Sequence, residues 1–233
     1  MFVAQSALRK GTLSVAYPLA LLSGLAQASG HYVVDDTALI DTHSCELELW
    51  REWHDGAQLN GLAPTCRLDG RWQLSLEAQR ESADGEHHNH YGVALKTLWR
   101  EIDEHGYGLG LVLAAEYNAS EKEWAEYQAV VPFSCGWEAL ALHLNLGVSH
   151  LPHAGDGVRQ RAAIWGMGLD YGVHARVNLI AEVSGEDRRG RHPLAQLGPR
   201  VALANGIELD LTYGRTLGGE RDHHLALGLI WAF

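Results

Sequence analysis

The sequence lacks a second long apolar run and has fewer positive than negative side chains. After residue 28 it has no segment of roughly 18 continuous apolar residues, so no further membrane helix is expected. It has 18 Lys and Arg against 29 Asp and Glu, for a formal net charge of −11. Nucleic acid is therefore not expected as a partner, because binding it requires cations that neutralise phosphates.

Cysteine is scarce, and its spacing suggests no metal finger. Cys45, Cys66 and Cys135 are the three cysteines, and no C-x-x-C pair occurs. The alternating glycines of 106–110 precede no helix, so they are no dinucleotide fingerprint. No cofactor is expected from either feature.

The N-terminal stretch has the organisation of a secretory signal. Arg9 and Lys10 precede an apolar run over 13–25, and Ala26-Gln27-Ala28 fits an A-x-A cleavage site. We expect residues 1–28 to be a signal peptide. A membrane helix is the alternative, but the run is short for a span of roughly 20 residues. Loss of the two cations takes the charge from −11 to −13.

The rest of the chain divides at residue 45. Residues 29–44 show no sustained alternation and are rich in aspartate, so we expect a periplasmic N-terminal lead-in, with an inserted plug as the alternative. Residues 45–233 alternate between apolar and polar residues in short runs, as β-strands do. We expect them to form one barrel.

The final run predicts how such a barrel closes. Leu225, Leu227, Leu229, Trp231 and Phe233 share one face of a strand, and mostly small residues share the other. A soluble protein seldom exposes so apolar an edge, because unpaired edges aggregate. The terminal aromatic residue resembles the C-terminal signal of outer-membrane barrels, which implies recognition by the barrel-assembly machinery.

The alternation predicts an all-β fold, an antiparallel transmembrane β-barrel of about twelve strands, or ten if the leading pair stays out of the wall. Tilted strands of about 9–11 residues suit a membrane crossing. Short turns at 69–70, 103–106, 135–136, 174 and 205–206 would share the periplasmic end with Phe233, and long loops the other end. The expected strands are 45–54, 65–68, 71–82, 90–102, 107–117, 124–134, 137–149, 160–173, 175–185, 194–204, 207–216 and 223–233.

The two faces of these strands differ in polarity. Leucine and valine dominate one face, as expected for contact with lipid. Aromatic residues gather near the strand ends, which is typical of membrane interfaces. A soluble β-sandwich or lipocalin-like barrel is the alternative, with its apolar faces inward. The opposite, polar face predicts these lumen-lining residues: Glu77, Lys96, Arg100, Glu116, His143, Asp170, Arg176, Glu182, Arg200, Glu208 and Asp210.

Two stretches resemble a known family. They are 34–38 (VDDTA) leading to 45–50 (CELELW), and 62–66 (LAPTC) leading to 72–76 (WQLSL). They resemble the outer-membrane barrel family named for the meta-pathway of phenol degradation, whose function is poorly defined. The resemblance implies an outer-membrane barrel in which Cys45 and Cys66 lie at one level of neighbouring strands. We therefore expect a Cys45–Cys66 disulfide and a free Cys135.

Histidines and arginines mark the expected outer rim. Imidazole is a common ligand of zinc, copper and nickel. A metal site is one interpretation of His87, His88, His90, His223 and His224, and solvated loop histidines are the other. Outer-membrane lipid is an expected partner. Lipopolysaccharide is another expected partner, whose phosphates could bind the basic loop residues Arg188, Arg189, Arg191 and Arg221. The alternative is that these arginines are solvated loop charges.

An enzyme is not expected. Outer-membrane lipases place a serine two residues after a histidine, but His143-Leu144-Asn145 has asparagine there. The prediction is therefore an exported, porin-like protein of the Gram-negative outer membrane for passive transport or exchange of small solutes. The alternative is a non-conducting structural or metal-binding barrel with a filled lumen.

Overall fold

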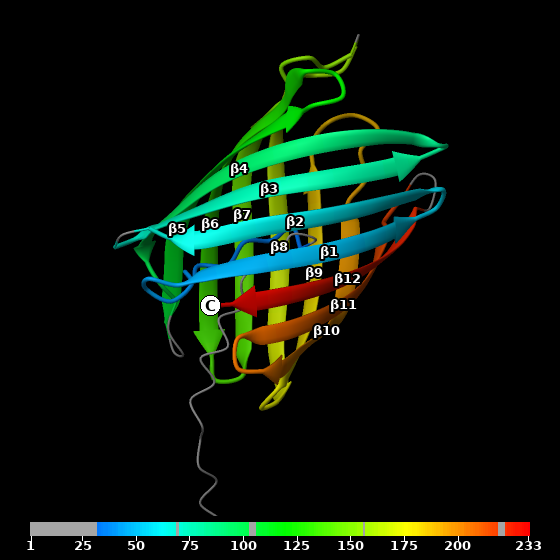
Figure 1. The fold of residues 1–233 in the computed structure, drawn as a ribbon. Coiled ribbons are helices and arrows are strands. Elements are labelled where there is room, and N and C mark those ends of the chain that lie inside the picture. The colour runs from blue at the N-terminus through cyan, green and yellow to red at the C-terminus, as the bar shows by residue number, and fades with distance from the viewer. Residues whose placement is uncertain (1–31, 69, 103–105, 156, 219–221) are drawn as a thin grey trace, which may run out of the picture.

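The barrel wall consists of twelve antiparallel strands (Figure 1). The computed structural model describes residues 32–68, 70–102, 106–155, 157–218 and 222–233, so the expected signal peptide lies outside the described residues. The strands are β1 (Cys45–His54), β2 (Ala57–Arg67), β3 (Trp72–Ala83), β4 (Glu86–Arg100), β5 (Tyr107–Asn118), β6 (Glu123–Trp137), β7 (Leu140–His150), β8 (Arg161–His174), β9 (Val177–Glu186), β10 (Leu194–Ala204), β11 (Ile207–Thr216) and β12 (His223–Ala232).

The barrel closes where β1 pairs with β12. The amide of Cys45 donates to the carbonyl of Phe233 at 2.9 Å, and the amide of Phe233 donates back at 2.8 Å. Every other strand pairs with its neighbours in sequence. The predicted fold class is thus confirmed, with twelve strands rather than ten, because the leading pair β1–β2 is part of the wall.

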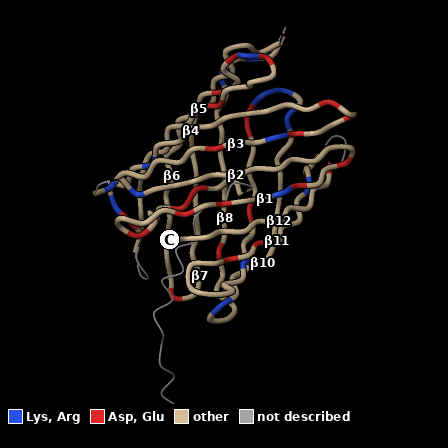
Figure 2. Tube along the Cα trace, in the orientation of Figure 1, with Lys and Arg blue, Asp and Glu red and all other residues tan. Residues whose placement is uncertain are grey.

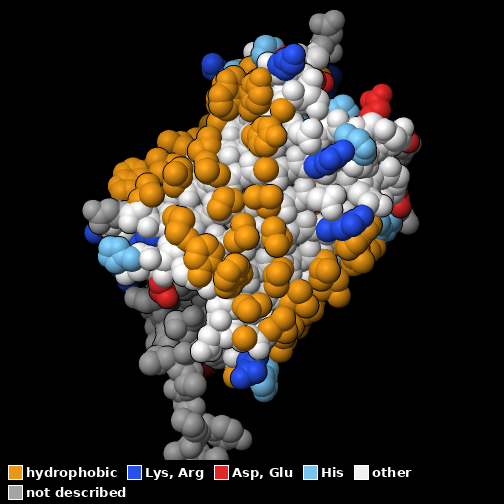
Figure 3. All heavy atoms as spheres, in the orientation of Figure 1, with side chains coloured by type: hydrophobic (Ala, Val, Ile, Leu, Met, Phe, Trp, Pro, Cys, Tyr) orange, Lys and Arg blue, Asp and Glu red, His pale blue; other side chains and the backbone are white. Residues whose placement is uncertain are grey.

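The alternation along each strand separates an apolar exterior from a polar interior. In β7, Leu142, Leu144 and Leu146 are exposed, whereas His143 and Asn145 between them are buried. Apolar side chains cover much of the middle of the visible wall, and charged and histidine side chains lie toward its ends (Figure 3). The soluble alternative, with apolar faces inward, does not describe this barrel.

Aromatic residues form two groups on the exterior. Trp72, Trp99, Tyr107, Trp137, Tyr171, Trp231 and Phe233 are exposed toward the end of the barrel that holds Phe233, here called the Phe233 end. Tyr91, Trp124, Tyr127 and Tyr213 are exposed toward the opposite end, here called the loop end. Two such girdles, one near each end of the wall, are typical of barrels that span lipid.

The connections differ from the predicted pattern at two places. Residues 57–64, expected to be loop, belong to β2, and the turn is Asp55–Gly56. The pairing of β2 with β3 is interrupted at Ala63 and Pro64, because proline has no N–H to donate to the ladder. Residues 135–136, expected to be a turn, lie within β6.

The two longest connections lie at the loop end. They are 151–160 between β7 and β8 and 187–193 between β9 and β10, whereas β8–β9 and β10–β11 turn at the Phe233 end through two residues each. In outer-membrane barrels the longer loops are extracellular. In the described part of the chain, no helix is long and apolar enough to cross a membrane.

The segment before β1 enters the barrel. We expected residues 29–44 to be a periplasmic lead-in, but Tyr32, Val34 and 36–40 are buried, and their partners are side chains of the inner wall. The described part of this segment thus corresponds to the inserted plug. The physical reason is complementarity, because the wall supplies polar partners for its backbone and carboxylates.

Candidate functional site: the barrel lumen

Most predicted lumen residues lie on the inner face of the wall. Charged positions are scattered along the strands as well as in the turns (Figure 2). The inner-face residues are Glu77, Lys96, Glu116, His143, Asp170, Glu182, Arg200, Glu208 and Asp210, and all of them are buried or half-buried.

Two predicted lumen residues were placed wrongly. A bulge between Leu98 and Arg100 breaks the alternation of β4, so Arg100 is exposed, with its guanidinium 4.2 Å from the ring centre of Tyr107. Arg176 lies in the β8–β9 turn and is also exposed. Both errors come from extending a period of two through a bulge or into a turn.

Residues 32–40, here called the lumen segment, are held first by β7 and β9. The amides of Val33 and Val34 donate to the carboxylate of Glu182 at 3.0 and 3.3 Å. Asn145 pairs with Asp35 twice: the Asp35 amide donates to Oδ1 at 2.8 Å, and Nδ2 donates to the Asp35 carbonyl at 2.7 Å. These bonds replace the strand partner that an extended segment would otherwise need.

The middle of the lumen segment is held by an ion pair with β4. Lys96 Nζ lies 2.8 Å from Asp36 Oδ1 and 3.9 Å from Asp35 Oδ1. Lys96 and Asp36 are 6% and 3% exposed, so the pair is shielded from water. Asp36 Oδ1 also accepts from the Ala38 amide at 3.0 Å, which fixes the turn of the segment at this point.

The end of the lumen segment is held near the Phe233 end of the wall. The amide of Ile40 donates to Gln73 Oε1 at 3.0 Å, and Arg67 donates to the carbonyl of Ile40 at 2.9 Å. The amide of Ile102 donates to the Thr37 carbonyl at 2.9 Å. Gln73 was missed because a lone inward glutamine carries no motif.

Glycines on the inner wall make room for the lumen segment. A Cβ at Gly166 would lie 2.8 Å from Val34 Cγ2, and one at Gly168 would lie 3.1 Å from Val34 Cγ1. A Cβ at Gly108 would overlap the side chain of Thr37. Gly166 and Gly168 share one face of β8, so they form a groove into which Val34 fits.

The first described residue of the segment contacts a charged cluster on β10 and β11. Thr212 Oγ1 donates to the Tyr32 hydroxyl at 2.9 Å, and the Arg200 guanidinium lies 5.4 Å from the Tyr32 ring centre. Arg200 Nε donates to Asp210 Oδ1 at 2.7 Å. Asp210 and Thr212 are fully buried, so the lumen is filled at this side of the barrel.

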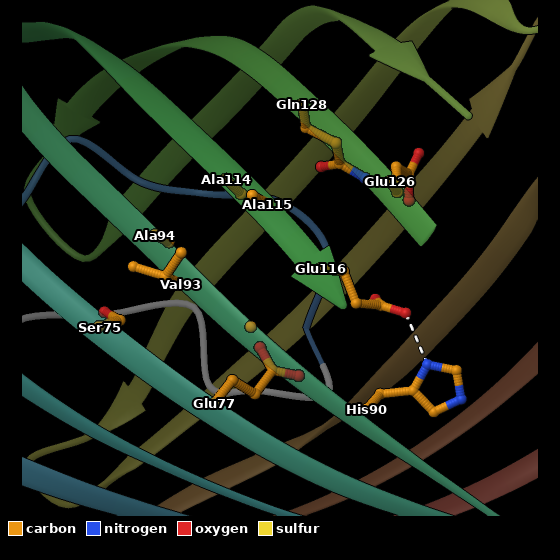
Figure 4. A pocket seen from close by; sticks show the side chains of 11 residues that line it. Ser75, Glu77, His90, Val93, Ala94, Ala114, Ala115, Glu116, Glu126 and Gln128 are labelled. Atoms are coloured by element: carbon orange, nitrogen blue, oxygen red, sulfur yellow. Dashed lines mark hydrogen bonds and ion pairs between the residues drawn. The ribbon is translucent and has the colours of Figure 1, made fainter. Parts of the chain in front are cut away.

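Open space remains toward the loop end. A cavity of about 180 Å³ is lined by Glu77, His90, Glu116, Glu126 and Gln128, among others (Figure 4). His90 Nδ1 lies 2.8 Å from Glu116 Oε1, which is the interaction drawn in the figure. The lining is rich in carboxylates, so this cavity favours cations over anions.

A second cavity adjoins the first. It has a volume of about 320 Å³ and shares Glu126 and Gln128 with its neighbour. Val33 and Asp35 of the lumen segment line it, as does Asn145. The lumen segment therefore forms part of the lining of the space on the loop side, which we call the vestibule.

The predicted metal site does not form. His87, His88 and His90 lie on β4, whereas His223 and His224 lie on β12, and β1, β2 and β3 separate these strands. Four inter-strand steps of about 4.8 Å place the two groups roughly 19 Å apart. Among the described residues, no three His, Cys, Asp or Glu side chains are arranged to hold a metal ion.

The individual histidines have other contacts. His87 Nδ1 lies 2.9 Å from Ser82 Oγ, and His223 Nδ1 lies 2.5 Å from the Tyr213 hydroxyl. His224 is buried, with its ring stacked on His54. The adjacency of His223 and His224 in sequence was misleading, because neighbours on a strand point to opposite faces.

A serine and a histidine meet inside the wall. Ser134 Oγ lies 2.8 Å from His143 Nδ1, and both residues are buried. Neither lines either of the two lumen cavities described above. A nucleophile needs access to substrate, so this pair satisfies polar groups rather than forming a catalytic dyad.

The disulfide expected at the Phe233 end is present. The sulfurs of Cys45 and Cys66 are 2.03 Å apart, and the two residues are direct partners in the β1–β2 register. Cys135 is free.

The loop arginines are divided between the barrel mouth and its surface. Arg188 is buried, where it pairs with Glu186 and donates to Ser149 Oγ at 3.0 Å, so it does not face outward as expected. Arg189 and Arg191 are exposed, and Arg221 lies outside the described residues.

The fold and lumen define a class: a closed twelve-stranded barrel of the porin type with a polar, partly filled interior. The chain belongs to the family described as "Uncharacterised conserved protein UCP029691", whose model matches residues 18–233. This family and the solved structures below support an outer-membrane barrel family, but not the phenol meta-pathway family that the motifs resemble. A comparison with curated proteins found no match to this sequence.

Three solved structures share the fold. The KdgM porin is 12% identical, with a TM-score of 0.66 over 81% of this chain and 99% of that one. The NanC porin is 10% identical, with a TM-score of 0.67 over 79% and 98%. The COG4313 outer membrane channel from Pseudomonas putida F1 is 12% identical, with a TM-score of 0.59 over 85% and 98%.

Proposed function

We propose that the protein is an outer-membrane channel for small solutes whose lumen is closed at rest by its own lumen segment. The apolar exterior, the two aromatic girdles and the two longest connections at one end support a place in the Gram-negative outer membrane, reached through an N-terminal signal peptide. The β12 strand, together with Phe233 that follows it, is then the part that the barrel-assembly machinery recognises.

The observation that carries the proposal is how the lumen segment is held. Its contacts with the wall are mainly hydrogen bonds and one ion pair, contributed by Glu182, Asn145, Lys96 and Gln73 on four different strands. Polar contacts of this kind exchange for contacts with water at modest net cost, whereas an apolar core does not. Release would also expose the buried apolar side chains of Val34, Leu39 and Ile40, so the closed state should dominate at rest.

The vestibule supports a solute class. Its carboxylates Glu77, Glu116 and Glu126 favour small neutral or cationic solutes. One solved KdgM porin structure is described as a complex with oligogalacturonate, a polyanion. The acidic vestibule argues against such a cargo here.

Planar-bilayer recording of the purified, exported protein tests the proposal. We expect rare openings of the wild type and sustained conductance of a variant that lacks residues 32–40. A potassium chloride gradient should reveal cation selectivity, and Glu77→Gln with Glu116→Gln should reduce it. If the deletion variant folds but never conducts, the channel proposal is wrong.

A second candidate function is a non-conducting structural barrel. The complete burial of Asp210 and Thr212 and the filled space around Tyr32 favour it. Persistent absence of conductance in the deletion variant, together with a folded barrel on gels of unheated samples, would select this alternative.

A further inference from the structure

The exterior of the wall has a groove at the loop end that the channel function does not use. It has a volume of about 600 Å³ and lies over β6, β7 and β8. Tyr127, Val148 and Arg161 line it, and Val148 is 60% exposed. These residues lie on the lipid-facing side of their strands, because the lumen residues of the same strands have the opposite parity.

The strand register divides the groove into three rows. Tyr127, His150 and Arg161 are direct cross-strand partners in the row nearest the loop end. Toward the Phe233 end, the next row is Ala129, Val148 and Ala163, and the third is Val131, Leu146 and Trp165. Two alanines in the middle row, between larger side chains on either side, create a depression. Its floor is apolar and its loop-end edge is polar and cationic.

The cationic edge has unused binding capacity. The side chain of Arg161 forms no ion pair with any described residue, and it is exposed. Neighbouring Arg159, by contrast, is paired with Asp187, and its hydrogen bond holds the pKa of that carboxyl below its usual range. His150 lies beside Arg161 in the row nearest the loop end, so its imidazole is a second polar group at this edge.

An aromatic stack places this edge at the membrane interface. Tyr117, Trp124, Tyr127 and His150 are in ring contact in series across β5, β6 and β7, with centroid distances of 5.6, 5.6 and 6.4 Å. Aromatic girdles lie at the level of lipid headgroups. Arg161 and His150 therefore lie where headgroups lie, and the alanine row lies where acyl chains begin.

We propose that this groove binds lipopolysaccharide, with one acyl chain over Ala129 and Ala163 and a phosphate of its lipid A moiety at Arg161 and His150. The loop end faces the outer leaflet, whose lipid carries such phosphates. A guanidinium binds phosphate through a planar pair of donors, and an apolar floor of small residues leaves space for a chain. The proposal rests on the proposed outer-membrane location but not on whether the barrel conducts.

Native mass spectrometry of delipidated protein, titrated with diphosphoryl lipid A in a nonionic detergent, tests the site. We expect one lipid A per wild-type barrel and at least tenfold weaker binding of Arg161→Ala. Ala163→Trp, which fills the floor without removing charge, should weaken binding similarly. The control is Arg215→Ala, which removes an exposed arginine near the loop end of β11, on another part of the wall, and should bind as the wild type does.

Titrations with two control lipids separate the contribution of the headgroup phosphates to binding from that of the acyl chains. Lipid A without its phosphates and phosphatidylethanolamine should each bind wild-type protein at least tenfold more weakly than diphosphoryl lipid A. Equal binding of all three lipids, or equal binding by Arg161→Ala and Arg215→Ala, would overturn the proposal. Slower migration after heating, measured for each variant, verifies that the barrel was folded.

Discussion

Replacing Lys96 with methionine should free the lumen segment. Methionine keeps most of the side-chain volume but removes the ammonium that lies 2.8 Å from Asp36 and 3.9 Å from Asp35. Asp36 is 3% exposed, so the substitution leaves a buried carboxylate without its cation. Breaking a buried ion pair in this way costs about 3–5 kcal/mol.

The cost falls on the state in which the segment is inside the barrel. Once the segment leaves, Asp36 reaches water and the penalty disappears. Since about 1.4 kcal/mol is a factor of ten in an equilibrium constant, release should become roughly 10² to 4 × 10³ times more favourable.

Hydrogen–deuterium exchange with mass spectrometry measures this release. We expect peptides covering 32–40 to lose protection in Lys96→Met, while peptides from β7 and β8 keep theirs. Lys122→Met removes an exposed loop lysine and should leave the pattern unchanged. The double variant Lys96→Met, Asp36→Asn should recover much of the protection, because no unpaired charge remains at Asp36. Full protection of 32–40 in Lys96→Met would refute the idea that this ion pair holds the segment.

Three further predictions concern the same barrel. Gly166→Val should displace the lumen segment by crowding Val34. Limited proteolysis of the folded protein should then cleave more readily near the N-terminus. Unchanged cleavage would contradict the fit of Val34 into the glycine groove. Cys45→Ser should lower the free energy of unfolding by about 3 kcal/mol, because the disulfide no longer restricts the unfolded chain over this sequence separation. Gels of samples heated in steps should then show unfolding at a lower temperature. Cys135→Ser is its matched control and should unfold at the wild-type temperature. Zinc titration should give the same isotherm for the wild type and for the double variant His88→Ala, His90→Ala. A difference between the two isotherms would show that these histidines bind metal.

Errors in the sequence-based prediction arose where local rules are interrupted. Arg100 was placed in the lumen because its position has the parity of Lys96, but the bulge at the end of β4 breaks that parity. Pro64 and the Asn60–Gly61 pair indicated a loop, yet residues 57–66 pair with β1 without interruption. Strand pairing there outweighs the local turn preference, because β1 and β2 must close the wall between β12 and β3.

The histidine cluster failed for a different reason. Positions 87, 88, 90, 223 and 224 share one end of the barrel, as the sequence predicted. Metal binding needs ligands within a few ångströms, and the number of strands between two residues decides that distance around the barrel. The sequence pattern gives the height of a residue along the barrel axis. Its distance from another residue around the wall is known only once the order of the strands is known.

The sequence by itself determined the wall of this protein. A period of two in side-chain polarity is a local property of an extended chain. The number of strands, the side of the wall that most residues face, the aromatic girdles and the closing strand could therefore all be inferred. The tertiary structure alone decided what fills the lumen inside this wall. Residues 32–40 carry no period, and their place is set by partners such as Glu182 and Asn145, more than a hundred residues away. Only the closed barrel brings these groups to one place, because each of them can be satisfied equally well by water until the lumen excludes it.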